Sequence, residues 1–370
     1  MENIYQKYGV KRVINASGKM TILGGSKVNK EVVEAMKEGA SNFFEVKDLL
    51  NKTGMYIANL LEVEDTYIVN SASGGIAQSI ASCITKDNER YLLDIYNQTN
   101  LKREVVLCKG HNVDYGTAIE VAVSLGGGKV VEAGYANACK IHHIENQITE
   151  NTVCLLYVKS HHCVQKGMPS IEDFVMIGKK YNLPVIVDAA AEEDLTKYYN
   201  LGVDVVIYSG TKALEGPTSG LLVGKKEFLN EVKKQSLGIG RVMKVGKESI
   251  LGLTKAITSY IEKEKMTMDE QVNRLLPFND KINQINGLQA KNVRDGAGRE
   301  IIRSEISFNE TILSMHTKEI VNALKEGEVA IYTREYRANE GKIEIDIRDV
   351  SETELEEIYQ KLKKIIGGKQ

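Results

Sequence analysis

Two side chains that could do chemistry stand at the ends of two strand-like runs of this 370-residue sequence. Asp188 ends the run VIVD, and Lys212 follows the run VDVVIYSG, with one helix-length segment between the two runs. A lysine amine forms an imine with an aldehyde, and a carboxylate keeps a pyridine nitrogen protonated so that the ring withdraws electrons. The pair therefore predicts a site for pyridoxal 5′-phosphate, bound as a Schiff base on Lys212 with its pyridine nitrogen on Asp188. Once substrate releases it, Lys212 would also act as the general base.

The elements that position this pair follow an alternating pattern. From about residue 65 to residue 225, short β-rich runs alternate with helical segments, which is typical of a parallel sheet covered by helices. Ligands of such sheets bind beyond the carboxyl ends of the strands, where Asp188 and Lys212 both fall. The expected strands are DTYIVN, REVVLC, KVVEAG, TVCLLYV, LPVIVD, VDVVIYS and GLLVG. We therefore expect an α/β fold with a mostly parallel seven-stranded sheet.

A change of texture near residue 247 predicts a second, smaller α+β domain. One long charged helix is expected over KESILGLTKAITSYIEKEKMTMDEQVNRLL, followed by the strands EIIRSEISFN, EVAIYTR and KIEIDI and a closing helix from Glu352. The alternation of apolar and acidic residues in KIEIDI is typical of a half-exposed antiparallel strand. The expected organisation is an N-terminal segment near the active site (1–30), a large cofactor-binding domain (31–250) and a small domain (251–370).

A cradle for the cofactor phosphate is predicted between the strand DTYIVN and the helix IAQSIASCI. The intervening residues read Ser-Ala-Ser-Gly-Gly, and the start of a helix favours a phosphate dianion. Ser73, Gly74 and Gly75 are the expected contacts. Ser209, shortly before the lysine, could add a hydroxyl.

Histidines at the same sheet edge are candidates for the remaining roles. The chain has no tryptophan, so we expect His111, directly after the strand REVVLC, to stack on the cofactor ring, with Tyr115 as the alternative. His161 and His162 follow the strand TVCLLYV and could approach the cofactor's phenolic oxygen or a leaving group.

Composition narrows the class of protein. The formal net charge is only −2, and basic residues are interleaved with acidic ones, which disfavours nucleic acid as a partner. The apolar runs are shorter than the roughly 20 residues of a membrane span, and the N-terminus has no signal-peptide stretch. We therefore expect a soluble, cytoplasmic protein without a membrane partner. Five cysteines without CxxC spacing predict reduced structural thiols and no metal site.

Four long segments resemble one family of enzymes. The segments RVINASGKMTILGGS, VNSASGGIAQ, YVKSHHCVQKGMPSIEDFVMIGKKYNLPVIVDAAAEEDL and GVDVVIYSGTKALEGPTSGLLVGKKE are similar to the selenocysteine synthase-related branch of fold-type I pyridoxal-phosphate enzymes. Within that branch, DAAAEEDL with YSGTKALEGPTSG most resembles the D-glucosaminate-6-phosphate ammonia-lyases. The resemblance implies a homodimer or higher homo-oligomer with cofactor sites at the subunit boundary. It also implies that the neighbouring subunit's cofactor phosphate is reached by Gly216, Thr218 and Ser219.

Departures from selenocysteine synthase itself concern the substrate. The synthases carry a tRNA-handling domain ahead of their VINA-like motif, whereas about a dozen residues precede RVINASG here. They also carry an arginine-bearing segment where this chain reads LLNKTGMYIANLL. Arg241, Lys244 and Lys247 do match their basic segment. We therefore expect a small phosphorylated substrate, with Arg241 and Lys244 as binding residues.

The expected reaction is an α,β-elimination with deamination of a small 2-amino-3-hydroxy acid. The resemblance favours D-glucosaminate 6-phosphate as substrate, with 2-keto-3-deoxygluconate 6-phosphate and ammonia as products. The leaving hydroxyl would take its proton from His161, His162 or water. The substrate carboxylate needs an arginine, for which Arg334 is favoured and Arg337 and Arg348 are alternatives. Two other functions stay open, a transferase (of amino, selenium or sulfur groups) and a non-catalytic cofactor-binding relative.

Overall fold

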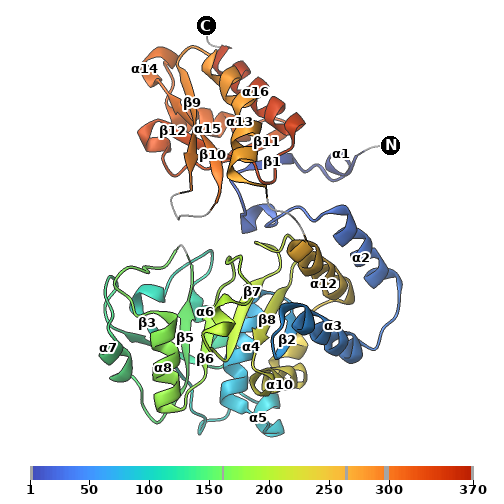
Figure 1. Cartoon of the computed structure of the whole chain (residues 1–370), viewed down its shortest axis with the longest axis vertical. Helices are drawn as coiled ribbons and strands as arrows, with labels where there is room; N and C mark the ends of the chain where they lie inside the picture. The colour runs from blue at the N-terminus through green and yellow to red at the C-terminus, as the bar shows by residue number, and fades with distance from the viewer. Residues whose placement is uncertain (1–2, 161, 263–265, 296–299, 368–370) are drawn as a thin grey trace. The chain divides into compact units, whose positions relative to one another are not determined.

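The chain folds into two compact units, one formed by Val28–Glu262 and one that joins Met1–Lys27 with Lys263–Gln370. Figure 1 shows the computed structural model of the chain, coloured from the N-terminus to the C-terminus. The N-terminal segment thus belongs to the same compact unit as the C-terminal residues. The residues that the structure describes are 3–160, 162–262, 266–295 and 300–367.

Helix α12 (Lys247–Glu262) belongs to the larger unit because it packs along α2 (Lys30–Ser41). The two helices approach closely at Gly39, where a Cβ atom would lie 2.7 Å from the Cα of Glu248. The larger unit therefore extends one helix beyond the boundary at residue 250 that the sequence suggested.

Seven strands form the central sheet of the larger unit, in the order β2-β8-β7-β6-β5-β3-β4. Strand β8 is antiparallel to both of its neighbours, β2 and β7, whereas the pairs from β7 through β4 are parallel. The sheet is therefore mostly parallel, and the expected strands are confirmed. The strands are β2 (Asp65–Val69), β3 (Glu104–Cys108), β4 (Lys129–Ala133), β5 (Thr152–Val158), β6 (Val185–Asp188), β7 (Val205–Ser209) and β8 (Gly220–Gly224).

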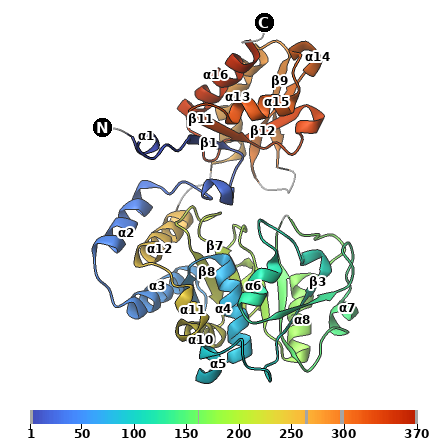
Figure 2. The same ribbon diagram turned by 180° about the vertical axis from the view of Figure 1, so that it is seen from behind.

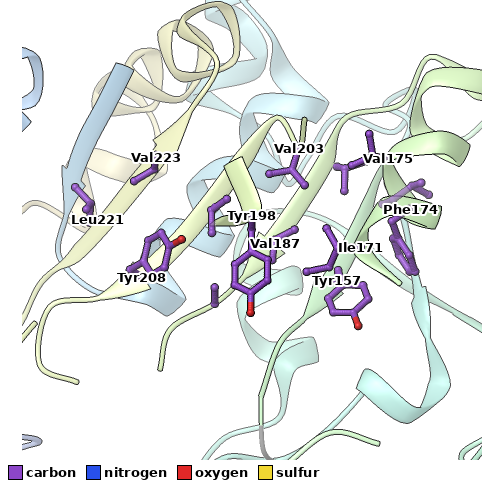
Figure 3. Close-up of a cluster of buried hydrophobic side chains, with 14 of the residues drawn as sticks. Tyr157, Ile171, Phe174, Val175, Val187, Tyr198, Val203, Tyr208, Leu221 and Val223 are labelled. Carbon is purple, nitrogen blue, oxygen red and sulfur yellow. The ribbon is translucent and has the colours of Figure 1, made fainter. Parts of the chain in front are cut away.

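Apolar cores cover both faces of this sheet. On one face, Tyr157 of β5 packs with Phe174 of α8 (Ile171–Tyr181), within the buried cluster drawn in Figure 3. On the other face, the neighbouring Leu156 joins the cluster of α4 (Ala72–Thr85). Figures 1 and 2 show α8 and α4 on opposite sides of the strands. Because both faces are buried, the carboxyl edge is where this sheet can present reactive groups.

Further helices complete the larger unit. Among the residues that the structure describes, each helix is too short or too polar to cross a lipid bilayer. The remaining helices of this unit are α3 (Val46–Leu61), α5 (Glu89–Leu93), α6 (Ile119–Leu125), α7 (Ile141–Glu145), α9 (Lys197–Asn200), α10 (Lys226–Lys234) and α11 (Ile239–Val242).

The smaller unit is α+β, as expected, but it contains two strands that the sequence did not suggest. Strand β1 pairs in parallel with β11, and β9 adds an edge to an antiparallel sheet of order β12-β10-β9. The strands are β1 (Arg12–Ala16), β9 (Leu288–Arg294), β10 (Ile302–Phe308), β11 (Val329–Thr333) and β12 (Lys342–Asp346). The helices are α1 (Ile4–Tyr8), α13 (Met268–Asn283), α14 (Glu310–Leu313), α15 (Thr317–Lys325) and α16 (Glu352–Gly367).

Two expectations about this region were wrong. The long helix expected from residue 247 is two helices, because Thr267 and Glu270 form a capping box that starts α13 after α12 has ended at Glu262. The run KIEIDI is buried instead of half-exposed, with Glu344 and Asp346 only 6% and 1% exposed. Both carboxylates lie against arginines, which makes their burial tolerable.

Candidate active site

Asp188 and Lys212 are brought to the same carboxyl edge by neighbouring parallel strands. Asp188 is the last residue of β6 and is paired with Ile207 of β7, and Lys212 lies in the turn that follows β7. Burial raises the pKa of the Asp188 carboxyl to about 6, and the nearby Lys212 ammonium opposes this rise. Its Oδ1 accepts a hydrogen bond of 3.1 Å from the Ala190 amide. A buried carboxylate of this kind fits a ligand that carries a positive charge.

The loop that presents Lys212 is closed by its own backbone. The Gly210 amide donates to the Ser219 carbonyl (2.8 Å), and the Gly216 amide donates to the Gly210 carbonyl (2.7 Å). At Gly210 a Cβ atom would lie 2.1 Å from Ser219 Oγ, so this close approach requires glycine. Gly216 and Ser219 are buried, whereas Thr218 is exposed. Gly216 and Ser219 therefore shape the loop, and Thr218 is the side chain that it presents outward.

The expected phosphate cradle is the first turn of α4. Ser71 caps this helix, and its Oγ accepts the Gly74 amide (3.0 Å) while its carbonyl accepts the Gly75 amide (2.9 Å). A Cβ atom at Gly75 would lie 2.9 Å from Leu222 of β8, so glycine here lets the helix start close to the sheet. The Ser73 hydroxyl, in contrast, lies 3.4 Å from the Tyr115 hydroxyl and belongs to a half-buried residue.

Of the two aromatic candidates, Tyr115 lies beside the cradle and His111 lies in the core. His111 is 0% exposed, and its ring packs edge-on against Tyr157 with centroids 4.5 Å apart. Burial lowers the pKa of His111 to about 4, helped by the charge of Lys159, so its ring is neutral. A stacking partner needs one open face, and the His111 ring has none in this structure.

The loop after β5 contains groups that the sequence reasoning missed. The Lys159 amide donates to the Asp188 carbonyl (2.7 Å), which carries the loop directly past the candidate carboxylate. Burial raises the pKa of the Cys163 thiol to about 12, and the Asp188 charge adds to this rise, so the thiol lies within electrostatic reach of that carboxylate. Lys159 and Cys163 follow β5, the strand next to β6, and this position was the signal available in the sequence. His162 is exposed, and His161 lies outside the described residues.

The basic segment divides into one structural lysine and two exposed cations. Lys247 Nζ donates to the carbonyls of Gly39, Ala40 and Asn42 at 2.6–2.8 Å and so satisfies the end of α2. The side chains of Arg241 and Lys244 are exposed. Only these two therefore keep the expected role of binding an anion.

The hydroxyl of Ser209, shortly before Lys212, lies 3.2 Å from the hydroxyl of Thr211.

The three candidate arginines of the smaller unit are paired with carboxylates. Arg334 donates through Nε to Glu344 (3.2 Å), and Arg348 donates through Nε and Nη2 to Asp346 (3.0 and 2.9 Å). Arg337 pairs with glutamates. Within the described part of the chain, no group of three or more histidine, cysteine or acidic side chains could hold a metal ion.

Comparison with known proteins identifies the family of the chain. The family model described as L-seryl-tRNA selenium transferase (SelA) matches residues 13–308. The chain is 44% identical over 363 residues to the D-glucosaminate-6-phosphate ammonia lyase of Salmonella typhimurium, covering 98% of each sequence. It is 32% identical over 366 residues to the 5′-C-glycyluridine monooxygenase-decarboxylase of a Streptomyces species, covering 98% of this chain and 92% of that protein.

A solved structure of a D-glucosaminate-6-phosphate ammonia-lyase superimposes on the chain with a TM-score of 0.95 at 43% identity, covering 100% of this chain and 99% of the other. The likeness includes both compact units, since it extends over the whole length. The chain therefore belongs to the SelA family and has the fold of the type I pyridoxal-phosphate enzymes.

Proposed function

We propose that this protein is a pyridoxal-phosphate-dependent ammonia-lyase acting on D-glucosaminate 6-phosphate. The observation that carries the proposal is the Asp188–Lys212 pair at one sheet edge, in a chain 44% identical over 98% of its length to a lyase of that name. The products are 2-keto-3-deoxygluconate 6-phosphate and ammonia. One water leaves the substrate during elimination and one enters on hydrolysis, so the balance is deamination.

The described residues fit the cofactor. The buried carboxylate of Asp188 is suited to a protonated pyridine nitrogen. Lys212 lies within electrostatic reach of Asp188, and its amine is suited to bind the cofactor aldehyde. The Ser73 hydroxyl and the start of α4 are suited to the phosphate, with Ser209 near by. When bound, pyridoxal phosphate supplies an electron sink for the carbanion at the substrate Cα.

The protein's own groups then move protons. The Lys212 amine would take the proton from the substrate Cα, and the turn after β7 holds it within electrostatic reach of Asp188. The departing C3 hydroxyl needs a proton, for which His162 and water are candidates; His161 lies outside the described residues. Arg241 and Lys244 are proposed to bind the substrate phosphate, and Arg334 its carboxylate, with Arg337 and Arg348 as the alternatives.

A second copy of the chain is proposed as partner, on the evidence of α3. One face of this helix buries Gly54 and Ile57, but the opposite face also carries large apolar residues, with Tyr56 50% and Leu60 37% exposed. Large apolar side chains that gather on the exposed part of a helix mark a surface that a partner can cover. The exposed Thr218 would then reach the neighbour's cofactor phosphate. Monomer mass for Tyr56→Glu and dimer mass for wild type in solution would support this.

A cytoplasmic location is proposed from the cysteines. All five are free and buried, as expected of thiols in a reducing compartment. Activity retained in reducing buffer and no labelling at the cell surface would support this location.

Ammonia release tests the function. Wild type loaded with pyridoxal phosphate is expected to release ammonia and a 2-keto acid in equal amounts from D-glucosaminate 6-phosphate, without an added keto acid. Lys212→Ala should release neither and should lack the visible absorption of the bound cofactor. Lys179→Ala, which changes an exposed lysine of α8, serves as matched control. Ammonia or amine transfer that depends on an added keto acid would point to an aminotransferase instead.

A further inference from the structure

A pyridoxal-phosphate ring bound by this chain must lie between two fixed points, and this inference rests on the cofactor proposed above. The cofactor carries its phosphate and its pyridine nitrogen at separate positions of one flat ring. The phosphate belongs at the start of α4, beside Ser73, and the nitrogen belongs on Asp188. A residue that stacks on the ring must therefore be near both.

Tyr115 meets this condition. Its hydroxyl lies 3.4 Å from Ser73 Oγ at the cradle end. Burial raises the pKa of Tyr115, whereas the hydrogen bond with Ser73 lowers it. The charge of Asp188 also raises this pKa, so the Tyr115 phenol lies within electrostatic reach of the carboxylate that is proposed to hold the pyridine nitrogen. The residue is half-buried and packs at the border of the apolar cluster that includes α4, unlike the fully buried His111.

The loop that carries Tyr115 holds it in place. Its amide donates to the Thr117 carbonyl (3.2 Å), and the amide of Gly116 donates to Asp114 Oδ1 (2.7 Å). Gly116 has φ +111°, a conformation that residues with a side chain rarely adopt, so the turn at this point depends on glycine. The position of Tyr115 is thus set by its own loop before any ligand binds.

His111 does not share these contacts. Its ring packs against Tyr157 in the core, and its carbonyl lies 3.9 Å from Cys163 Sγ. The preceding Gly110 is enclosed as well, since a Cβ atom there would lie 2.4 Å from Met168 Cε. His111 therefore fills the core beneath the loops that border the site.

We propose that Tyr115 is the aromatic residue that stacks on the pyridine ring of bound pyridoxal phosphate, and that His111 supports the surrounding loops from the core. Stacking and burial of a flat ring need the aromatic face, not the hydroxyl. Tyr115→Phe should therefore preserve what Tyr115→Ala removes.

Cofactor binding alone tests this assignment. Wild type and variants are stripped of cofactor with hydroxylamine and titrated with pyridoxal phosphate, while visible absorption and circular dichroism of the bound cofactor are recorded. Tyr115→Ala is expected to raise the Kd about 10-fold or more and to lose most of the visible circular dichroism. Tyr115→Phe is expected to stay within about 3-fold of wild type.

His111→Ala and Tyr135→Ala are the comparison variants, the second changing a tyrosine that is 67% exposed. His111→Ala should lower the thermal midpoint but keep the visible dichroism of the cofactor, and Tyr135→Ala should change neither. Wild-type values for Tyr115→Ala, or loss of dichroism in His111→Ala without loss of thermal stability, would overturn the assignment. A wild type that binds no pyridoxal phosphate overturns both proposals, whereas one that binds it but releases no ammonia overturns only the function.

Discussion

The carboxylate of Asp188 and the ammonium of Lys212 interact at the carboxyl edge of β6 and β7. Burial nevertheless outweighs this attraction and raises the pKa of Asp188 to about 6. One lysine is thus too little to compensate for the buried charge. A second cation at Asp188, such as a protonated pyridine nitrogen, would stabilise the ionised form.

This relationship makes stability depend on pH in the cofactor-free protein. The pKa of Asp188 is raised from 3.8 to about 6, so the folded state binds the proton more tightly than the unfolded state. Stability attributable to Asp188 is present at low pH and falls as pH rises from about 4 to 6. We expect Asp188→Asn to be more stable than wild type by up to about 3 kcal/mol above pH 6, and to show little difference below pH 4.

Urea unfolding of both cofactor-free proteins across pH 4–8 measures this difference. In the presence of pyridoxal phosphate, the order should reverse above pH 6 because Asp188→Asn cannot hold the pyridine nitrogen protonated. Asp269→Asn, an exposed aspartate in the first turn of α13, is the control for removing a carboxylate. A difference between Asp188→Asn and wild type that does not vary with pH would contradict the explanation.

The sheet and the placement of Asp188 and Lys212 at one edge of it were predictable because their signals are local. Each strand of the large sheet is a short apolar run, and Asp188 and Lys212 follow two of these runs in the sequence. The start of α8 likewise has a local signal, because Ser170 and Asp173 stand three residues apart and form a capping box in the structure.

Features that depend on distant partners were not predictable. Strand β1 exists through its pairing with β11, more than 300 residues later in the chain. Both His111 and Tyr115 follow the same strand, so the sequence alone does not tell which of them is free to stack on the cofactor ring. The choice depends on which ring the fold buries. Burial of Asp346 depends on Arg303, which a period-two pattern does not reveal.

Gly220 tests how closely the cradle must approach the sheet. A Cβ atom at this position would lie 2.7 Å from the backbone carbonyl of Ser71 and 2.9 Å from the Ala72 amide. Backbone atoms cannot turn aside as a side chain can, so Gly220→Ala must shift the start of α4. We expect a loss of about 1–3 kcal/mol in the free energy of unfolding and weaker binding of pyridoxal phosphate. Gly367→Ala, where no atom lies within 4 Å, is the control.

Denaturation with and without cofactor measures both effects of Gly220→Ala. Unchanged cofactor affinity in a destabilised variant would show that the approach matters for packing only.

The buried pair Arg303 and Asp346 is expected to stabilise the smaller unit. Both residues are 1% exposed, and Arg303 Nε lies 3.0 Å from Asp346 Oδ2. Burial alone would raise the pKa of Asp346, but the guanidinium groups of Arg348 and Arg303 hold it at about 2. Asp346→Asn removes the carboxylate that both guanidinium groups contact, while Asp295 (2.6 Å) and Glu344 (3.9 Å) still face Arg303. The substitution should therefore cost about 2 kcal/mol at pH 7.

Because the folded pKa of Asp346 is depressed, this contribution exists above pH 4 and is lost as pH falls toward 2. The penalty for Asp346→Asn, measured by urea unfolding, should therefore shrink in acid. A penalty that is equal at pH 3 and pH 7 would mean that lost packing, not charge, explains it.

The basic segment separates substrate binding from stability within a few residues. Arg241 and Lys244 are exposed, whereas Lys247 donates to three carbonyls at the end of α2. We expect Arg241→Ala and Lys244→Ala each to raise the KM for D-glucosaminate 6-phosphate about 10-fold, since each removes a charged hydrogen-bond donor from the phosphate. The KM for D-glucosaminate without phosphate should stay unchanged. Lys247→Ala should instead lower thermal stability and leave the ratio of the two KM values as in wild type. Steady-state ammonia release with both substrates, together with thermal unfolding, distinguishes substrate binding from a role in stability. Equal KM increases for both substrates in Arg241→Ala would rule out phosphate binding by Arg241.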